Sequence, residues 1–322
     1  MLRLFIKGNE ELKHKNYKQA LYYYDQGIKL DSSLADIFNN RGLVYFNMGE
    51  YEKALADYNQ ALQIKADLKD AYFNRAALFQ ETGDYKASMA DLNQLIVFFP
   101  DSLSLRFSRA KSALELEDYP ASLKDLNFIL RQAPNYAAAY DSRGYIHLLS
   151  HEYEKAEADL RKAIALNEKQ DLAHANLGLL YTKQGNFEEA IIHLNRSIEL
   201  NPYEIYSLNI RAWVLIQMKK YSQALSDINK SLKIEGKNAL AYRNRGVYYF
   251  SSNKIQEAIQ DLSQARTMNP KLEWTDFFLA ECFLKASNIT KACQFWTFAL
   301  EFNPKEAAQK IQIHCPGSPS NP

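Results

Sequence analysis

Six arginines recur at multiples of 34 residues, each inside an otherwise apolar stretch such as AYFNRAALF at 71–79. They are Arg41, Arg75, Arg109, Arg143, Arg211 and Arg245. A guanidinium presents a planar fork of donors that can hold a carboxylate through two parallel hydrogen bonds. So regular a series is expected either to form ion pairs inside the protein or to form a ladder that binds an anionic ligand.

Six aspartates accompany these arginines, each 16 residues further along the chain. They are Asp57, Asp91, Asp125, Asp159, Asp227 and Asp261. The three equivalent stretches that lack the arginine also lack the aspartate, and have Lys7 with Tyr23, Leu177 with His193, and Leu279 with Phe295. Pairing each arginine with the preceding aspartate breaks this match. We therefore predict six structural ion pairs, with a ligand-binding ladder of arginines as the alternative.

The stretch from residue 1 to residue 306 repeats without insertion every 34 residues. Small residues occupy positions 8 and 20 of each repeat, an aromatic residue usually occupies position 17, and position 32 is often proline. Apolar residues recur at helical spacing on both sides of a break near position 15, so each repeat is expected to form two helices joined by a turn. The nine repeats are 1–34, 35–68, 69–102, 103–136, 137–170, 171–204, 205–238, 239–272 and 273–306.

This pattern resembles the tetratricopeptide repeat family, whose 34-residue helix-turn-helix repeats have small residues at positions 8 and 20 and a proline near the end. The resemblance covers nearly the whole chain. It implies an all-α fold, a right-handed superhelical solenoid with the first helix of each repeat lining a concave groove and the second helix on the convex side. Beyond the repeats, residues 307–314 are expected to form a short capping helix and residues 315–322 a flexible tail.

A ligand in that groove would contact positions 2, 5, 6, 9, 12 and 13. Position 6 is asparagine in four repeats, and an amide can both donate to and accept from a peptide backbone. Similar asparagines form a ladder in the O-linked N-acetylglucosamine transferases. Aromatic side chains and a cation would add anchoring surface, unless they pack in the core and the amides bridge neighbouring helices. The predicted groove residues are Asn40, Asn74, Asn176, Asn244, Phe73, Phe107, Tyr145, Trp213 and Arg243.

One alternative function is that of a co-chaperone. Co-chaperones of this family bind the acidic tails of heat-shock chaperones through a clamp of lysine, arginine and asparagine side chains. Asn9 and Asn40 match two positions of that clamp, but Phe5, Asp70 and Asn74 stand where cations are needed. Without those cations the clamp cannot balance a cluster of carboxylates.

Residues typical of catalysis or metal binding are sparse. His147 and His151 have the i, i+4 spacing of a metal site, but no further ligand or catalytic glutamate accompanies them. Neither a phosphate-binding glycine loop nor a nucleophile elbow is present. Cys282, Cys293 and Cys315 have no metal-type spacing and predict reduced thiols in an intracellular compartment. We expect no enzyme activity, no cofactor and no metal.

Charge and hydropathy narrow the class of partner. The 39 basic and 38 acidic residues nearly cancel, so no overall field favours nucleic acid or an anionic membrane. No apolar run is long enough to span a membrane or to serve as a signal peptide, which favours the cytoplasm. We predict a non-enzymatic scaffold or adaptor that binds a peptide or helical segment of a partner protein in its groove. A self-assembling array, joined through the apolar first helix, is the second alternative.

Overall fold

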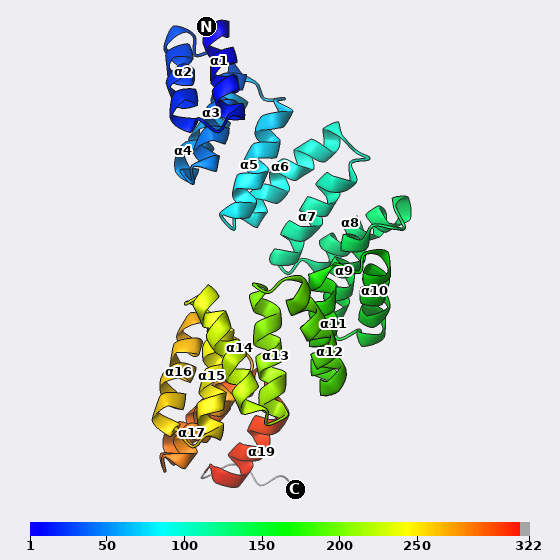
Figure 1. Cartoon of the computed structure of the whole chain (residues 1–322), viewed down its shortest axis with the longest axis vertical. Helices are drawn as coiled ribbons and strands as arrows, with labels where there is room; N and C mark the ends of the chain where they lie inside the picture. The colour runs from blue at the N-terminus through cyan, green and yellow to red at the C-terminus, as the bar shows by residue number, and fades with distance from the viewer. Residues whose placement is uncertain (316–322) are drawn as a thin grey trace. The chain divides into compact units, whose positions relative to one another are not determined.

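The computed structural model describes residues 1–315, and all the regular structure in this part of the chain is helical (Figure 1). Each repeat contributes an odd-numbered helix followed by an even-numbered one, which confirms the predicted all-α repeat solenoid. The odd-numbered helices are α1 (Leu2–Lys13), α3 (Ala35–Asn47), α5 (Lys69–Glu81), α7 (Leu103–Glu115), α9 (Ala137–Leu149), α11 (Asp171–Gln184), α13 (Ile205–Gln217), α15 (Ala239–Ser251) and α17 (Thr275–Lys285).

The even-numbered helices begin at position 17 of every repeat, where an aromatic or isoleucine side chain stands. They are α2 (Tyr17–Leu30), α4 (Tyr51–Ile64), α6 (Tyr85–Phe98), α8 (Tyr119–Gln132), α10 (Tyr153–Leu166), α12 (Phe187–Leu200), α14 (Tyr221–Ile234), α16 (Ile255–Met268) and α18 (Ile289–Ala299). The chain then forms one more helix, α19 (Pro304–His314).

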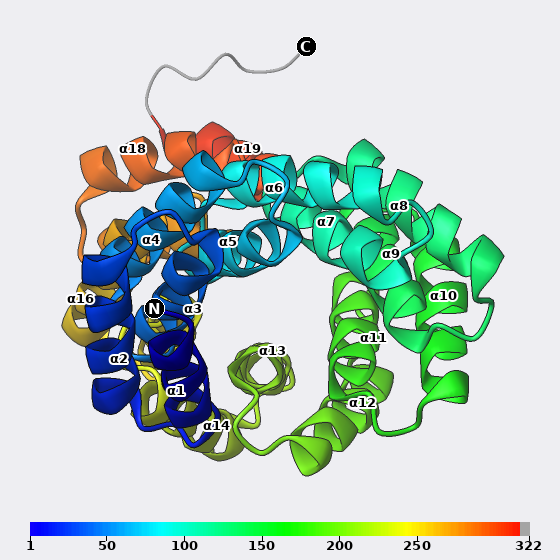
Figure 2. The ribbon, with the colours of Figure 1, turned by 90° about the horizontal axis from the view of Figure 1, so that it is seen from above.

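The chain is divided into two compact units, Met1–Ser150 and the part that begins at His151. The boundary therefore lies inside the fifth repeat, between α9 and α10. Within each unit, consecutive helices pack side by side. The backbones of neighbouring odd-numbered helices also approach one another, with the exception of α5 and α7, whose backbones make little contact. The even-numbered helices of the described residues form no close packing with one another. Figure 2 accordingly shows α11 and α13 on the inner side of α12 and α14. The odd-numbered helices therefore form the inner face of each unit.

Small residues at position 8 allow the two helices of a repeat to approach closely. A Cβ added to Gly42 would lie 2.8 Å from the ring of Tyr58, at position 24 of the same repeat, and 3.2 Å from the backbone oxygen of Ala54. Tyr58 and Ala54 are both fully buried. In this repeat the ring of Tyr58 thus fills the space that a missing side chain at position 8 leaves open, and this contact fixes the distance between the two helices.

The turn inside each repeat has a left-handed residue at position 15. Gly49, Gly83 and Gly185 have positive φ angles there, and the remaining six repeats place a non-glycine residue in the same conformation, at Lys15, Glu117, His151, Lys219, Asn253 and Ser287. A residue with a Cβ pays a steric cost in this region, whereas glycine does not. The shape of the turn is therefore kept even where the sequence does not favour it.

Exchanges at position 15 should change stability through the backbone alone. A Cβ added to Gly83 would meet nothing within 4 Å, so we expect Gly83→Ala to lower the free energy of unfolding by about 1 kcal/mol. We expect Glu117→Gly to raise it by a similar amount. Equilibrium urea unfolding of the two variants measures both effects. A Gly83→Ala variant as stable as the parent would contradict the steric cost that we assign to a side chain at position 15.

The C-terminal helix differs from its predicted form. It begins at Pro304, three residues before the expected start, because that proline occupies the first helical turn, where its missing N–H costs nothing. Helix α19 packs on α18, and the ring of His314 stacks on Trp296 with centroids 5.5 Å apart. The prediction of a flexible tail over 315–322 lies outside the described residues, apart from Cys315.

The prediction that all three cysteines are reduced is wrong for two of them. Cys293 on α18 and Cys315 form a disulfide, because α19 folds back along α18 and brings their Cα atoms to 5.7 Å. Cys282 remains a free thiol, and burial raises its pKa to about 12. The disulfide removes the argument from reduced thiols for an intracellular location. No helix in the described part of the chain is long and apolar enough to cross a membrane.

Candidate functional site

The recurring arginines lie between the helices of their own repeat. Arg75 on α5 donates from Nε and Nη2 to the two carboxylate oxygens of Asp91 on α6, at 2.8 and 2.7 Å. Only 5 % of the Asp91 side chain is exposed. The same two-pronged bond, at 2.6–2.9 Å, joins Arg41 to Asp57, Arg109 to Asp125, Arg211 to Asp227 and Arg245 to Asp261. Arg143 and Asp159 lie on α9 and α10, on the two sides of the boundary between the units.

In five of the six cases, a further contact joins the arginine to the preceding repeat. Nη1 of Arg75 donates to Oδ1 of Asn59 on α4, at 2.5 Å. Position 25 of the preceding repeat supplies the acceptor in every such case, and the further acceptors are Asp25 for Arg41, Asn93 for Arg109, Asn127 for Arg143 and Asn195 for Arg211. Arg245 bonds to its aspartate alone among the described residues. We call this arrangement of a position-7 arginine, a position-23 aspartate and a position-25 side chain the arginine tie.

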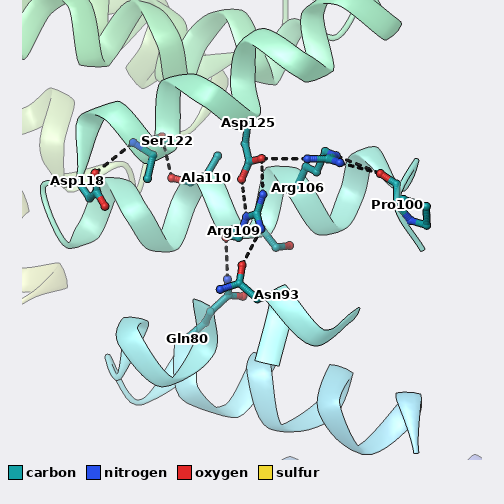
Figure 3. A network of polar contacts seen from close by, with 11 residues as sticks. Gln80, Asn93, Pro100, Arg106, Arg109, Ala110, Asp118, Ser122 and Asp125 are labelled. Carbon is teal, nitrogen blue, oxygen red and sulfur yellow. Dashed lines mark hydrogen bonds and ion pairs between the residues drawn. The ribbon is translucent and has the colours of Figure 1, made fainter. Parts of the chain in front are cut away.

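Figure 3 shows the tie of the fourth repeat. Arg109 on α7 lies between Asp125 on α8 and Asn93 on α6. A second guanidinium, that of Arg106, reaches the same carboxylate at 3.4 Å and donates to the backbone oxygen of Pro100 at 2.9 Å. All three guanidinium nitrogens of Arg109 are thus occupied within the protein, which leaves this arginine little capacity to bind an external anion.

A cluster of ionisable rings replaces the arginine tie in the sixth repeat. His193 stands in place of the aspartate, and its Nδ1 lies 3.2 Å from Nδ1 of His174. The His193 ring stacks on Tyr181, whose hydroxyl donates to Glu157 and accepts from Arg161, both at 2.7 Å. Burial, together with the positive charges of His174 and Arg161, lowers the pKa of His193 to about 4. Both helices of this repeat are therefore joined through neutral rings.

The predicted asparagines of the first unit, Asn40 and Asn74, are linked through hydrogen bonds to other asparagines. Asn40 on α3 donates to Asn9 on α1 at 2.8 Å and accepts from Asn39 at 3.0 Å, and Asn74 on α5 donates to Asn39 at 3.0 Å. Tyr24 also donates to Asn9, at 2.7 Å. These amides connect three successive odd-numbered helices. The two asparagines that match a co-chaperone clamp, Asn9 and Asn40, belong to this chain of amides.

The predicted aromatic residues of the first unit differ in exposure. Phe73 on α5 is 58 % exposed, next to Asn74 in sequence. Phe107 on α7 is half-buried against Tyr136, with ring centroids 5.4 Å apart, and belongs to a core cluster. Tyr145 on α9 is half-buried as well. Phe73 is thus the predicted aromatic residue with a ring available to a partner.

A pocket of about 390 Å³ opens on the inner face of the first unit, where the backbones of α5 and α7 make little contact. It is lined by residues from α3, α5, α6 and α7. They are Phe46, Ala77, Gln80, Glu81, Tyr85, Lys111, Ser112 and Glu115. Gln80 crosses the gap and donates to the backbone oxygen of Ser108 at 3.1 Å and to Ser112 at 3.0 Å. The pocket combines two aromatic rings with two exposed carboxylates and one ammonium group.

The inner face of the second unit is filled by its own side chains. Trp213 on α13 packs against Trp274, with ring centroids 6.1 Å apart, and the Arg243 guanidinium lies 4.3 Å from the Trp213 ring centre. Asn244 is fully buried and donates to the backbone oxygen of Asn209 at 2.8 Å. Asn176 on α11 is 8 % exposed. Of the predicted residues of this unit, only Trp213 retains partial exposure.

The repeated helix pairs match models of a known protein family. Family models described as tetratricopeptide repeat or TPR repeat match residues 8–49, 35–68, 70–102, 107–169 and 172–204, which together are more than half of the chain. The chain belongs to the tetratricopeptide repeat family. The three repeats after residue 204 continue the same period and the same helix pairs.

Solved structures show the same fold at low sequence identity. The chain is similar to a chain of the APC/C hetero-tetramer Cut9–Hcn1, with a TM-score of 0.67 and 18 % identity over 92 % of its own length, and it spans 59 % of that chain. A weaker match is yeast Tom70, with a TM-score of 0.47 and 14 % identity, covering 97 % of this chain and 94 % of that chain. Another is YrrB, described as a TPR protein with an unusual peptide-binding site, with a TM-score of 0.46 and 19 % identity, covering 57 % of this chain and 95 % of that chain. No curated protein sequence matches this chain.

Position 25 is the part of the arginine tie that the sequence analysis missed. The signal is present in the sequence, because position 25 is asparagine or aspartate in the six repeats that precede an arginine-bearing repeat. The repeats that precede Leu177 and Leu279 have Arg161 and Ser263 instead. Comparing each repeat with the next one, in addition to comparing positions within a repeat, would have found it.

Breaking one arginine tie should be costly. Arg75→Leu leaves the buried Asp91 carboxylate without its cation, and we expect the free energy of unfolding to fall by about 3–5 kcal/mol. The double variant Arg75→Leu/Asp91→Phe copies the residues of the ninth repeat and should lose less than the single variant. Equilibrium unfolding with the two variants side by side measures the difference. A loss below about 1 kcal/mol for Arg75→Leu, the range of a solvated pair, would contradict a structural tie.

The histidine cluster should make stability depend on pH. Because the folded-state pKa of His193 lies below its ordinary value of 6.5, the unfolded chain takes up a proton first as the pH falls. The stability present above pH 6.5 should therefore be lost between pH 6.5 and about 4, by at most about 3 kcal/mol. In urea unfolding near neutral pH and near pH 4, His193→Phe should lose less stability than the parent over this interval. Equal losses would contradict the prediction.

Proposed function

We propose that the chain is a non-enzymatic scaffold that binds a segment of a partner protein on the inner face of its first unit. The fold of the tetratricopeptide repeat family supports a general role in protein–protein interaction. The observation that carries the proposal for this chain is the pocket lined by α5 and α7, two neighbouring odd-numbered helices that make little backbone contact, although α6 and α7 pack closely on each other.

The chemistry of the pocket favours a basic side chain. Glu81 and Glu115 are exposed carboxylates on its rim, and Lys111 is the single cation, so the lining carries a net charge of −1. Phe46 and Tyr85 offer aromatic faces, on which a lysine or arginine side chain can lie with its charge directed to the carboxylates. The exposed ring of Phe73, on the same helix α5, adds an apolar contact for the flanking residues of the segment.

Peptide selection on the folded chain tests this proposal. Peptides selected from a random library should be enriched in lysine or arginine, and the double variant Glu81→Lys/Glu115→Lys should weaken their binding at least tenfold. Charge reversal at Glu52, an exposed residue of α4 outside the pocket, is the matched control and should leave binding unchanged.

Two results would overturn the proposal. Selected peptides without basic residues would contradict the assigned chemistry. Equal effects of the pocket variant and of Glu52→Lys would show that the carboxylates act only through the overall charge of the protein. Fluorescence anisotropy at two salt concentrations separates the second case from specific binding, because a contact inside a pocket is screened less by salt than a surface field.

A further inference from the structure

The ninth repeat departs from the geometry of the others at its first two residues. The odd-numbered helices from α3 to α15 begin at position 1 of their repeats, whereas α17 begins at Thr275, position 3. Trp274, just before it, has a φ angle of +69°. It is the single described residue with a positive φ angle outside position 15. For a tryptophan this conformation is unfavourable, so the surrounding contacts must hold it.

The side chains of Glu273 and Trp274, the two residues before α17, point to the inner face of the second unit. The carboxylate of Glu273 accepts from Nζ of Lys183 on α11 at 2.9 and 2.7 Å, across 90 residues of sequence. The Trp274 ring packs against Trp213 on α13 and against Phe278. The Trp274 N–H donates to Oδ1 of Asn303, at 3.0 Å. Residues 272–274 thus lie across a face that α11, α13 and α15 build.

Arg243 lies beneath this segment. Its guanidinium contacts the Trp213 ring, donates from Nη1 to the backbone oxygen of Glu273 at 3.2 Å and from Nε to Asn244 at 3.0 Å. It is 7 % exposed and forms no ion pair with any described residue, and burial lowers its pKa to about 10. Burying this cation among neutral hydrogen-bond acceptors is costly, and the nearby charge of Glu273, which acts to raise the Arg243 pKa, offsets only part of the effect of burial. A carboxylate brought by another chain could form the direct ion pair that Glu273 does not.

We propose that residues 272–274 occupy this face as an internal ligand, and that a partner segment with an acidic residue next to an aromatic residue displaces them. The recognising groups are those that hold the internal segment: Lys183 for the carboxylate, Arg243 for the backbone oxygen next to it, and Trp213 for the aromatic ring. The charges near the face include these two cations, Lys285 beside Phe250, and Glu273 itself. Once Glu273 leaves, the face is cationic, which suits an acidic segment.

The internal segment lowers the apparent affinity of this face, because a partner must first displace it. The inference rests on the proposed role in protein binding but concerns a different unit and the opposite charge. A failure here would leave the pocket between α5 and α7 unaffected, and a failure at that pocket would leave this face unaffected.

A synthetic peptide of residues 270–276, PKLEWTD, is a direct probe. We expect it to bind the double variant Glu273→Gly/Trp274→Gly at least tenfold more tightly than it binds the parent, because the variant frees the face and glycine relaxes the left-handed residue. The control peptides PKLQWTD and PKLEATD should each bind the double variant at least fivefold more weakly than PKLEWTD. Fluorescence anisotropy of labelled peptides measures all three.

Three outcomes would overturn the proposal. They are equal affinity of PKLEWTD for parent and double variant, equal binding of PKLEWTD and the two control peptides, and retained tight binding when Lys183→Met is added to the double variant.

A second measurement applies even if the double variant fails to fold. In an otherwise unchanged chain, Lys183→Met removes the exposed ion pair without touching the core. Hydrogen exchange of the backbone amides at 273–275 should then quicken at least tenfold, while the amides of α13 keep their rates. Unchanged exchange at 273–275 would show that the segment is a fixed part of the fold, and would refute its displacement.

Discussion

The structure depends on a buried carboxylate held by a guanidinium. In a repeat array, the two helices of each repeat must pack on each other and on the neighbouring repeat. Most of this packing is apolar and could form between any two helix pairs. The arginine tie adds hydrogen bonds of defined direction between these helices. One planar group satisfies an aspartate on the second helix of its own repeat and an amide or carboxylate on the second helix of the repeat before it. Three helices are fixed by one side chain, whose donors lie in a plane.

Three repeats lack the tie, and the sixth and ninth replace it with other contacts. The sixth repeat replaces it with stacked rings around His193, and so exchanges a permanent charge for groups that titrate. The ninth replaces it with Leu279 and Phe295, and Arg266 of the preceding repeat bonds instead to Asp276, at position 4, at 2.7 Å. In that repeat the first helix starts late and its leading residues cross the inner face. In the ninth repeat, loss of the repeated polar contact therefore coincides with a departure from the repeated geometry, whereas the helices of the sixth repeat begin at the usual positions.

The sequence predicted the features that recur and missed those that occur once. The period, the helix pairs and the pairing of Arg75 with Asp91 follow from residues that change together every 34 positions. The partner at Asn59 was detectable in the same way. The turn of Trp274 toward Trp213 and the return of α19 that joins Cys293 to Cys315 have no second copy to compare. The groove asparagines show a further limit, because an amide that binds a peptide and one that bonds to the next helix have the same spacing.

The reach of the arginine into the preceding repeat also sets rules for how such a chain can change in length. Excision of the third repeat would bring Asn59 next to Arg109, a donor and an acceptor that fit as before. Excision of the sixth repeat would bring Arg161 into the place of Asn195, facing Arg211, and two guanidinium groups would meet where one acceptor is required. We therefore expect that loss of a repeat preserves the polar contacts at some places in the chain and breaks them at others, although all repeats have the same length.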